Sequence, residues 1–151
     1  MEQKLELKYR SYSDLAQADS KVQTLIEEAR KAAKKSHAPY SKFNVGAAAR
    51  LKSGTILHGA NCESEVYPAG VCAERNLLFN AATNHAEDPI ESLAIVSLST
   101  DQECYPCGFC RQSLVDAERR QGAKIEVIMA GAKTAKVVDT AQTLVPFTFE
   151  L

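Results

Sequence analysis

The chain has 151 residues, a formal net charge of -1, and 45% hydrophobic and 25% charged residues. This composition is typical of a globular protein and excludes disordered and fibrous classes, and the length fits one domain. The small net charge lacks the basic footprint of a protein that binds nucleic acid or an anionic membrane. No apolar run approaches the roughly 18 residues of a membrane span, and residues 1–20 lack a hydrophobic signal core.

Residues 1–18 show little pattern, and we expect a loosely held arm before a single domain over residues 19–151. The predicted elements are a helix from 19 to about 36, a hairpin of strands 45–51 and 55–60, a helix over 71–84, a strand over 92–99, a helix over 107–120, a strand over 124–130 and an edge strand over 136–138. Strands and helices alternate after the hairpin, so this order predicts an α/β fold with a mixed sheet between helices.

The first strand of the hairpin is rich in small residues, from Gly46 to Ala49. Small side chains let another element approach the strand closely. We expect a helix that carries the cysteine motifs described next to pack on this strand.

Three cysteines stand where two of the predicted helices begin. Cys72 precedes Glu74 by two positions, and Cys107 and Cys110 belong to a Pro-Cys-x-x-Cys sequence with the short spacing that zinc sites use. A helix N-terminus favours the thiolate form that binds metal. Three thiolates leave one zinc position open, which is typical of a catalytic site, and a nearby glutamate that is not a ligand could move protons. We therefore predict a zinc ion on the three thiolates and a catalytic role for Glu74.

A zinc ion with three thiolates carries a net negative charge, which weakens its pull on a bound water. Arg75 lies three residues after Cys72, on the same face of the predicted helix. Its guanidinium can donate to sulfur while staying charged. We predict that Arg75 supports the site from behind the ligands and restores the acidity of the metal.

The remaining cysteines and the histidines allow one alternative. Cys104 could join Cys72, Cys107 and Cys110 in a closed four-cysteine site that holds a structural zinc or an iron–sulfur cluster. Such a site would leave Glu74 without a task, and Pro106 separates Cys104 from the helix start. We therefore expect Cys62 and Cys104 to be free thiols. The three histidines, at positions 37, 58 and 85, lack a paired spacing, and we expect them to be loop or surface residues. In an unexported chain, this cysteine usage favours a cytosolic location.

Several motifs in one order resemble the small, homotetrameric type of zinc-dependent cytidine deaminase. They are Tyr40-Ser41-Lys42-Phe43-Asn44-Val45-Gly46-Ala47-Ala48, Asn61-Cys62-Glu63, Tyr67-Pro68-Ala69-Gly70-Val71-Cys72-Ala73-Glu74-Arg75 and Pro106-Cys107-Gly108-Phe109-Cys110-Arg111-Gln112. Zinc deaminases as a class use such cysteine ligands with a non-ligating glutamate. The resemblance implies an α/β/α sandwich with a five-stranded mixed sheet. It also implies hydrolysis of cytidine and deoxycytidine to uridine and deoxyuridine, with release of ammonia, in pyrimidine salvage.

The resemblance also assigns roles to individual residues. It implies one zinc per subunit on Cys72, Cys107 and Cys110, with Glu74 carrying protons. The residues that it implies for substrate binding are Asn61 and Glu63 at the ribose 3′-hydroxyl, Phe43 and the Ala73 backbone at the sugar and base, and Tyr67 and Phe149 from neighbouring subunits of a homotetramer. No nucleic acid or membrane partner is expected.

Two residues depart from the family pattern. Tyr105 stands where a small serine usually precedes Pro-Cys-Gly, and its ring could narrow the choice of substrate. Cys62 replaces an aliphatic residue and should face away from the ligand, because Asn61 and Glu63 share the opposite face of an extended segment. Two alternatives stay open: a deaminase of another aminopyrimidine nucleoside, or a non-enzymatic four-cysteine metal protein. A polynucleotide-editing enzyme is disfavoured, because Glu63 would repel a continuing phosphodiester.

Overall fold

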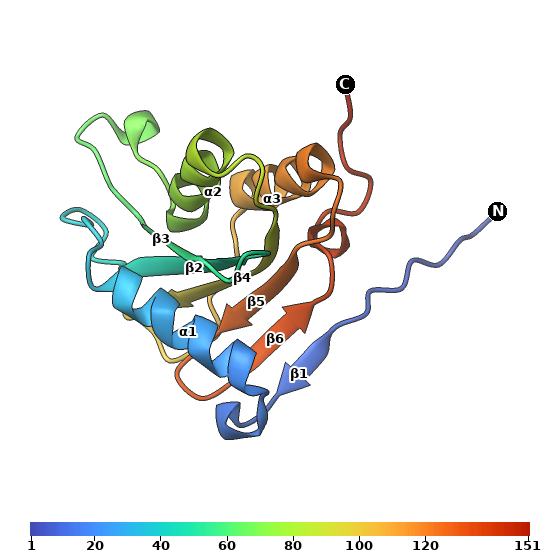
Figure 1. Ribbon diagram of the computed structural model, residues 1–151, viewed down its shortest axis with the longest axis horizontal. Coiled ribbons are helices and arrows are strands. Elements are labelled where there is room, and N and C mark those ends of the chain that lie inside the picture. Colours follow the sequence, from blue (N-terminus) through green and yellow to red (C-terminus); the bar gives the residue numbers. More distant parts are fainter.

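The computed structural model describes all 151 residues and is an α/β/α sandwich around one sheet (Figure 1). The helices are α1 (Ser20–Ala33), α2 (Ala73–Asn84) and α3 (Gly108–Gln121), and the strands are β1 (Arg10–Tyr12), β2 (Val45–Leu51), β3 (Ile56–Ala60), β4 (Ile90–Ser97), β5 (Glu126–Ala130) and β6 (Ala135–Val138). The strand order is β1-β6-β5-β4-β2-β3, in which only β4 and β5 run parallel. The predicted mixed sheet between helices is confirmed.

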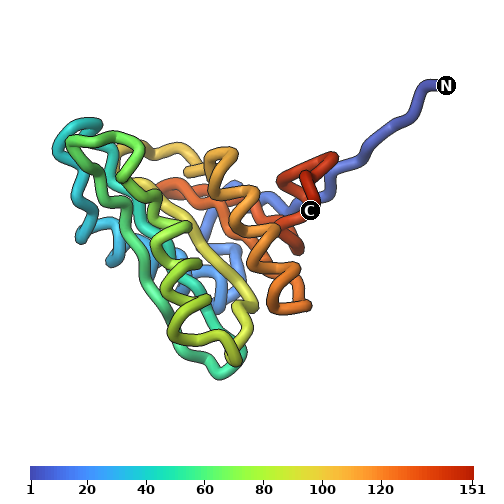
Figure 2. Tube along the Cα trace, turned by 90° about the horizontal axis from the view of Figure 1, so that it is seen from above, coloured from blue at the N-terminus to red at the C-terminus, as the bar shows by residue number.

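The sheet separates two hydrophobic cores. Helix α1 covers one face, where Leu25 and Ile26 pack with the β5 residue Ile128. Helices α2 and α3 lie side by side on the other face (Figure 2). There Leu77 of α2 and Leu114 of α3 pack with strand residues such as Leu93 of β4. Strand β4 contributes to both cores, which explains its nearly continuous apolar sequence. No helix is long and apolar enough to cross a membrane.

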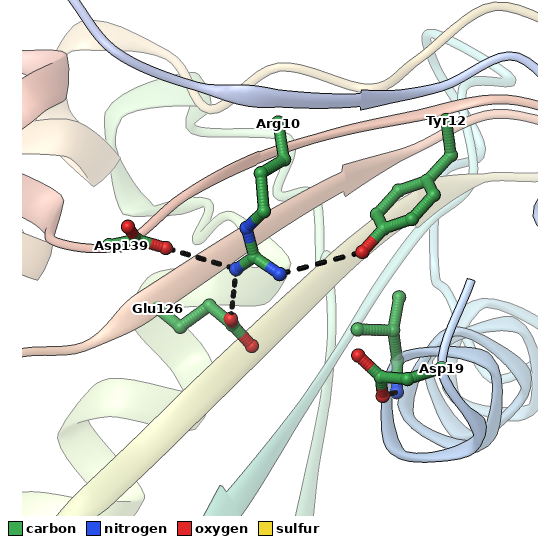
Figure 3. A network of polar contacts seen from close by, with 6 residues as sticks. Arg10, Tyr12, Asp19, Glu126 and Asp139 are labelled. Atoms are coloured by element: carbon green, nitrogen blue, oxygen red, sulfur yellow. Dashed lines mark hydrogen bonds and ion pairs between the residues drawn. The ribbon is translucent and has the colours of Figure 1, made fainter.

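The sheet has six strands, whereas the sequence predicts five. The additional strand is β1, which pairs antiparallel with β6, so that β6 is not an edge. Arg10 anchors it: its guanidinium contacts Glu126 on β5 and donates to Asp139 at 3.0 Å, as Figure 3 shows. Tyr12 packs against the core beside α1. A strand of three residues leaves no periodic signal, so the sequence shows only an arm here.

Two glycines bring the helices close to the hairpin. A Cβ on Gly46 of β2 would lie 2.1 Å from the carbonyl oxygen of Ala29 in α1. A Cβ on Gly59 of β3 would lie 2.4 Å from the carbonyl oxygen of Ala73 in α2. The helix that closely approaches Gly46 is therefore α1. The expected packing of a cysteine-bearing helix on this strand occurs on its other face, where Ala47 and Ala49 pack in one core with Leu77 of α2. The cysteine-bearing helix α2 makes its close approach to the neighbouring strand β3.

Candidate metal centre and adjoining pocket

Three cysteine sulfurs meet where α2 and α3 begin. Cys72 and Cys107 are the residues that cap the N-termini of α2 and α3, and Cys110 lies in the first turn of α3. The Sγ atoms of Cys72 and Cys107 are 4.0 Å apart, and those of Cys107 and Cys110 are 3.5 Å apart. All three lie within 4.8 Å of one another. Tetrahedral zinc with Zn–S bonds of about 2.3 Å requires sulfurs about 3.8 Å apart, so these residues fit the metal.

The thiols of this cluster share negative charge unequally. A hydrogen bond from Cys110 lowers the pKa of Cys72 to about 5, and the Arg75 guanidinium acts in the same direction. The same interaction with Cys72 raises the pKa of Cys110, and burial adds to this effect. These shifts favour the thiolate form at Cys72 over that at Cys110. A divalent cation would stabilise the thiolate form of all three.

Glu74 lies in the first turn of α2, two residues after Cys72, and only 4% of its surface is exposed. Burial raises the pKa of its carboxyl group, and the negative charge of Cys72 adds to this effect. A carboxyl group that is kept from bulk solvent beside a metal site can hold and release a proton. The sequence places Glu74 beside the cluster, and it lies there.

Arg75 joins the cluster to an aromatic ring. Its guanidinium donates to the Sγ of Cys72 at 3.8 Å and lies 5.6 Å from the centre of the Phe109 ring. The Nε atom is buried without a hydrogen-bond partner. The hydrogen bond with Cys72 raises the pKa of Arg75, which keeps its positive charge beside the sulfurs. The contact with Phe109 was not foreseen, although an aromatic residue between the two cysteines of Pro-Cys-x-x-Cys was visible in the sequence.

Cys104 is not part of the cluster. The group of potential metal ligands contains Cys72, Cys107 and Cys110 alone. Cys104 is 9% exposed, packs in the core beneath α2 and α3, and burial raises the pKa of its thiol to about 12. The closed four-cysteine alternative therefore has no geometric basis, and a zinc ion on the three sulfurs would keep one coordination position free.

A pocket of about 520 Å³ adjoins the cluster. Cys72 and Arg75 line it, together with Asn61, Glu63 and Tyr67. Cys62, expected to face away from the ligand, is among the lining residues as well. The pocket thus brings together five of the eleven residues that were singled out for metal and substrate, although they come from three separate stretches of the chain.

Glu63 has one occupied and one open carboxylate oxygen. Its Oε1 accepts backbone N–H groups of Tyr40 at 3.0 Å and Ser41 at 3.1 Å. The hydroxyl and N–H of Ser41, with the N–H of Tyr40, hold the pKa of Glu63 below its usual range. Tyr40 and Ser41 both line the pocket, and the sequence analysis gave them no role. Their place at the start of the Tyr40-Ser41-Lys42-Phe43 motif was the available signal.

Asn61 uses most of its hydrogen-bonding capacity on three residues of its own chain, Ser36, Phe43 and Val45. Its Oδ1 accepts from the Val45 N–H at 2.9 Å and from the Ser36 hydroxyl at 2.5 Å. Its Nδ2 donates to the Phe43 carbonyl at 2.8 Å. One N–H of the amide is left for a ligand.

Three of the six residues singled out for substrate binding lie outside the pocket lining. Ala73 is buried at the start of α2, where only its backbone could meet a ligand. Phe43 is 42% exposed, and Phe149 is 69% exposed on the C-terminal tail. Tyr105 also lies outside the lining, and its hydroxyl accepts from Lys136 on β6 at 2.6 Å. The Tyr105 side chain therefore contacts Lys136 of β6 and is not part of the wall of this pocket.

Comparison with known proteins gives the same class. Residues 19–123 match the family described as the cytidine and deoxycytidylate deaminase zinc-binding region. A cytidine deaminase from Sporosarcina psychrophila is 41% identical over 95 residues, which are 63% of this chain and 68% of the relative. One from Halalkalibacterium halodurans is 40% identical over 94 residues, which are 62% of this chain and 70% of the relative.

Solved structures agree with the fold. The crystal structure of cytidine deaminase from Burkholderia pseudomallei superposes with a TM-score of 0.73 and 35% identity, and the match covers 84% of this chain and 98% of that one. The enzyme from Mycobacterium tuberculosis gives a TM-score of 0.68 and 27% identity, over 88% and 100% of the two chains.

The sandwich and the three-sulfur centre with its buried glutamate define a zinc-dependent enzyme of the deaminase class. The chain belongs to the cytidine and deoxycytidylate deaminase family, because the family match spans 105 of its 151 residues (19 to 123).

Proposed function

We propose that this enzyme hydrolyses cytidine and deoxycytidine to uridine and deoxyuridine, with release of ammonia. The observation that carries the proposal is the buried carboxyl group of Glu74 beside three sulfurs that are spaced for zinc. The names of the relatives support the choice of cytidine. A zinc ion on the three thiolates would supply the Lewis acidity that lowers the pKa of water from 15.7 toward roughly 7.

Glu74 carries the proton transfers in this proposal. Its carboxylate accepts a proton from the attacking water and delivers it to N3 of the pyrimidine. It then takes the proton of the new C4 hydroxyl and passes it to the amine, which departs as ammonia while the C4 carbonyl forms. Burial supports this role, since it raises the pKa of Glu74 toward the range in which one group can both take and give a proton. Arg75 offsets the negative charge of the thiolates through its contact with Cys72.

The pocket beside the cluster holds the sugar. Glu63 keeps one carboxylate oxygen open, and Asn61 keeps one N–H, which together match the acceptor and donor sides of a ribose hydroxyl. We assign them to the 3′-hydroxyl. Phe43 and the Ala73 backbone would meet the base and sugar, and these two roles rest on the resemblance of their motifs.

We further propose a cytoplasmic homotetramer with a role in pyrimidine salvage. The cysteines are all unpaired, which suits a reducing compartment. Tyr67 and Phe149 are 74% and 69% exposed, which suits aromatic side chains that complete the pocket of a neighbouring subunit.

The first experiment follows the consumption of cytidine by ultraviolet absorbance. Glu74→Ala should lower kcat by about 10²- to 10⁴-fold, the usual contribution of general acid–base catalysis. Zinc content, measured on the same samples, should stay at one per chain, because Glu74 is not a ligand. Glu87→Ala, at an exposed position after α2, is the matched control and should behave as the parent enzyme. Loss of zinc together with activity in Glu74→Ala would remove the assigned role.

A further inference from the structure

Residues 1–9 form an extended arm without a neighbour. The arm leads into β1 and projects away from the body of the molecule (Figures 1 and 2). The sheet of the same chain offers the arm no strand to pair with. Strand β1 pairs with β6 only over Arg10–Tyr12, and β6 ends at Val138. No backbone hydrogen bond outside the regular elements involves residues 1–9. Their N–H and C=O groups are therefore open to pairing with another strand.

The arm has one apolar and one charged face. Leu5, Leu7 and Tyr9 alternate with Lys4, Glu6 and Lys8. In extended chain, residues two apart project to the same side, and Lys4 Nζ accordingly lies 3.3 Å from Glu6 Oε1. The three apolar side chains are 65%, 50% and 53% exposed, in that order. Such a strand matches a partner strand of the same alternation.

The charges of the arm are complementary to themselves. If two arms align antiparallel with Leu5 opposite Leu5, then Glu2 faces Lys8 and Lys4 faces Glu6, each pair occurring twice by symmetry. Opposite charges directly across a strand pair are stabilising, and like charges are destabilising. Alignment about Glu6 would instead place Glu6 opposite Glu6. Alignment about Leu7 would pair Glu6 with Lys8 but would place Lys4 opposite Arg10. The arrangement centred on Leu5 has more opposite-charge pairs and no like-charge pair, so the charge pattern favours it.

We infer that the arms of two copies of this chain pair as an antiparallel ribbon centred on Leu5. At about 3.3 Å per residue, the two Arg10 residues would be roughly 33 Å apart, so the two bodies can stand at opposite ends of the ribbon. A two-stranded ribbon is only marginally stable in water, so the association is weak and reversible. The arm lies before the matched residues 19–123, and this contact is independent of the proposed deamination.

Disulfide trapping tests the pairing in the full-length, zinc-loaded protein. Leu5→Cys, in a background with the exposed Cys62 changed to Ser, should link two chains under mild oxidation, because directly opposed residues are within the range of a disulfide. Tyr9→Cys is the matched control: it is similarly exposed, but its two copies would be roughly 26 Å apart. We expect about tenfold more linked dimer from Leu5→Cys. Equal yields from the two positions, or none from position 5, would overturn the inference.

Charge reversal provides a second test of the pairing. Within Leu5→Cys, the pair Lys4→Glu and Lys8→Glu makes the arm wholly acidic, and the pair Glu2→Lys and Glu6→Lys makes it wholly basic. Each variant alone should lose most of the cross-link by repulsion. A mixture of the two, with different tags, should recover it between unlike chains. Cross-linking that ignores these charges contradicts the arrangement, whatever the protein does with cytidine.

Discussion

The two oxygens of the Glu63 carboxylate have different surroundings, and this difference makes the residue suited to recognise a sugar. Oε1 is held by the N–H groups of Tyr40 and Ser41, which fixes the orientation of the side chain. The second oxygen is left for a hydroxyl donor. The Ser41 hydroxyl, together with these N–H groups, keeps the pKa of Glu63 low, so the group is an acceptor at neutral pH.

Glu63→Gln should therefore impair nucleoside binding and spare the metal. The amide can present an N–H where the carboxylate presents an acceptor, and one charge-assisted hydrogen bond of about 1.5 kcal/mol corresponds to roughly tenfold in affinity. Steady-state kinetics should show KM for cytidine raised by about this factor, with zinc content unchanged. Glu65→Gln, on the exposed part of the same loop, serves as the control. An unchanged KM would separate Glu63 from the sugar.

At the scale of elements, glycine decides how closely α1 can approach the sheet. The contact of Gly46 with the Ala29 carbonyl and the Ala33 backbone leaves no room for a methyl group. These contacting atoms belong to a helix backbone, which cannot move aside as a flexible side chain would.

Gly46→Ala should consequently destabilise the protein by about 1–3 kcal/mol or more, as overpacking does. Urea unfolding, followed by circular dichroism, measures the loss as a lower transition midpoint. Gly108→Ala provides the comparison, because a Cβ there would meet nothing within 4 Å. Equal midpoints for both variants would mean that α1 can shift away from β2 without cost.

The elements also show what the sequence could predict. Helices and strands with several apolar residues on one face were placed to within a few residues, and Gly122 ends α3 with a φ of 65°, as expected. Strand β1 was missed because it is fixed by distant partners, chiefly Glu126 and Asp139 around Arg10. Helix α2 packs on β2 as predicted, but the closer approach of α1 to its other face was missed, because a run of small residues does not say on which face a neighbour lies.

The metal ligands and Glu74 were predictable from spacing, since helix starts and short Cys-x-x-Cys pairs have a fixed geometry. The Arg75 contact with Cys72 followed from helical periodicity and is present. By contrast, the Phe109 ring over Arg75 and the Tyr40 and Ser41 donors to Glu63 depend on how separate segments meet. Local patterns contain no such information.

At the scale of the whole molecule, the proposed tetramer gives the pocket parts from more than one chain. Glu74 would act within its own chain, while Phe149, which lies outside its own chain's pocket, would serve a neighbour. Two inactive variants can then restore one another, since a mixed oligomer contains some pockets with both residues intact.

Glu74→Ala and Phe149→Ala should each be impaired alone, and the two should regain cytidine turnover after they are mixed, unfolded and refolded together. Sedimentation analysis should show the same assembly for all samples. Glu74→Ala mixed with Glu63→Gln, both assigned to one chain's own pocket, is the control pair, and should show no more turnover than the two variants refolded separately. A first mixture that gains no turnover over its separate variants would contradict the placement of Phe149 in a neighbour's pocket.

The 3.5 Å approach of the Cys107 and Cys110 sulfurs has a practical consequence. Once a chelator strips the cluster, the neighbouring thiols are in position for oxidation by air, and a bridge between them would prevent the metal from returning. Purified protein that has lost its metal should thus lose the ability to bind zinc, through oxidation of these thiols, well before it unfolds. Reductant supplied before zinc should revive it, whereas zinc supplied alone should not.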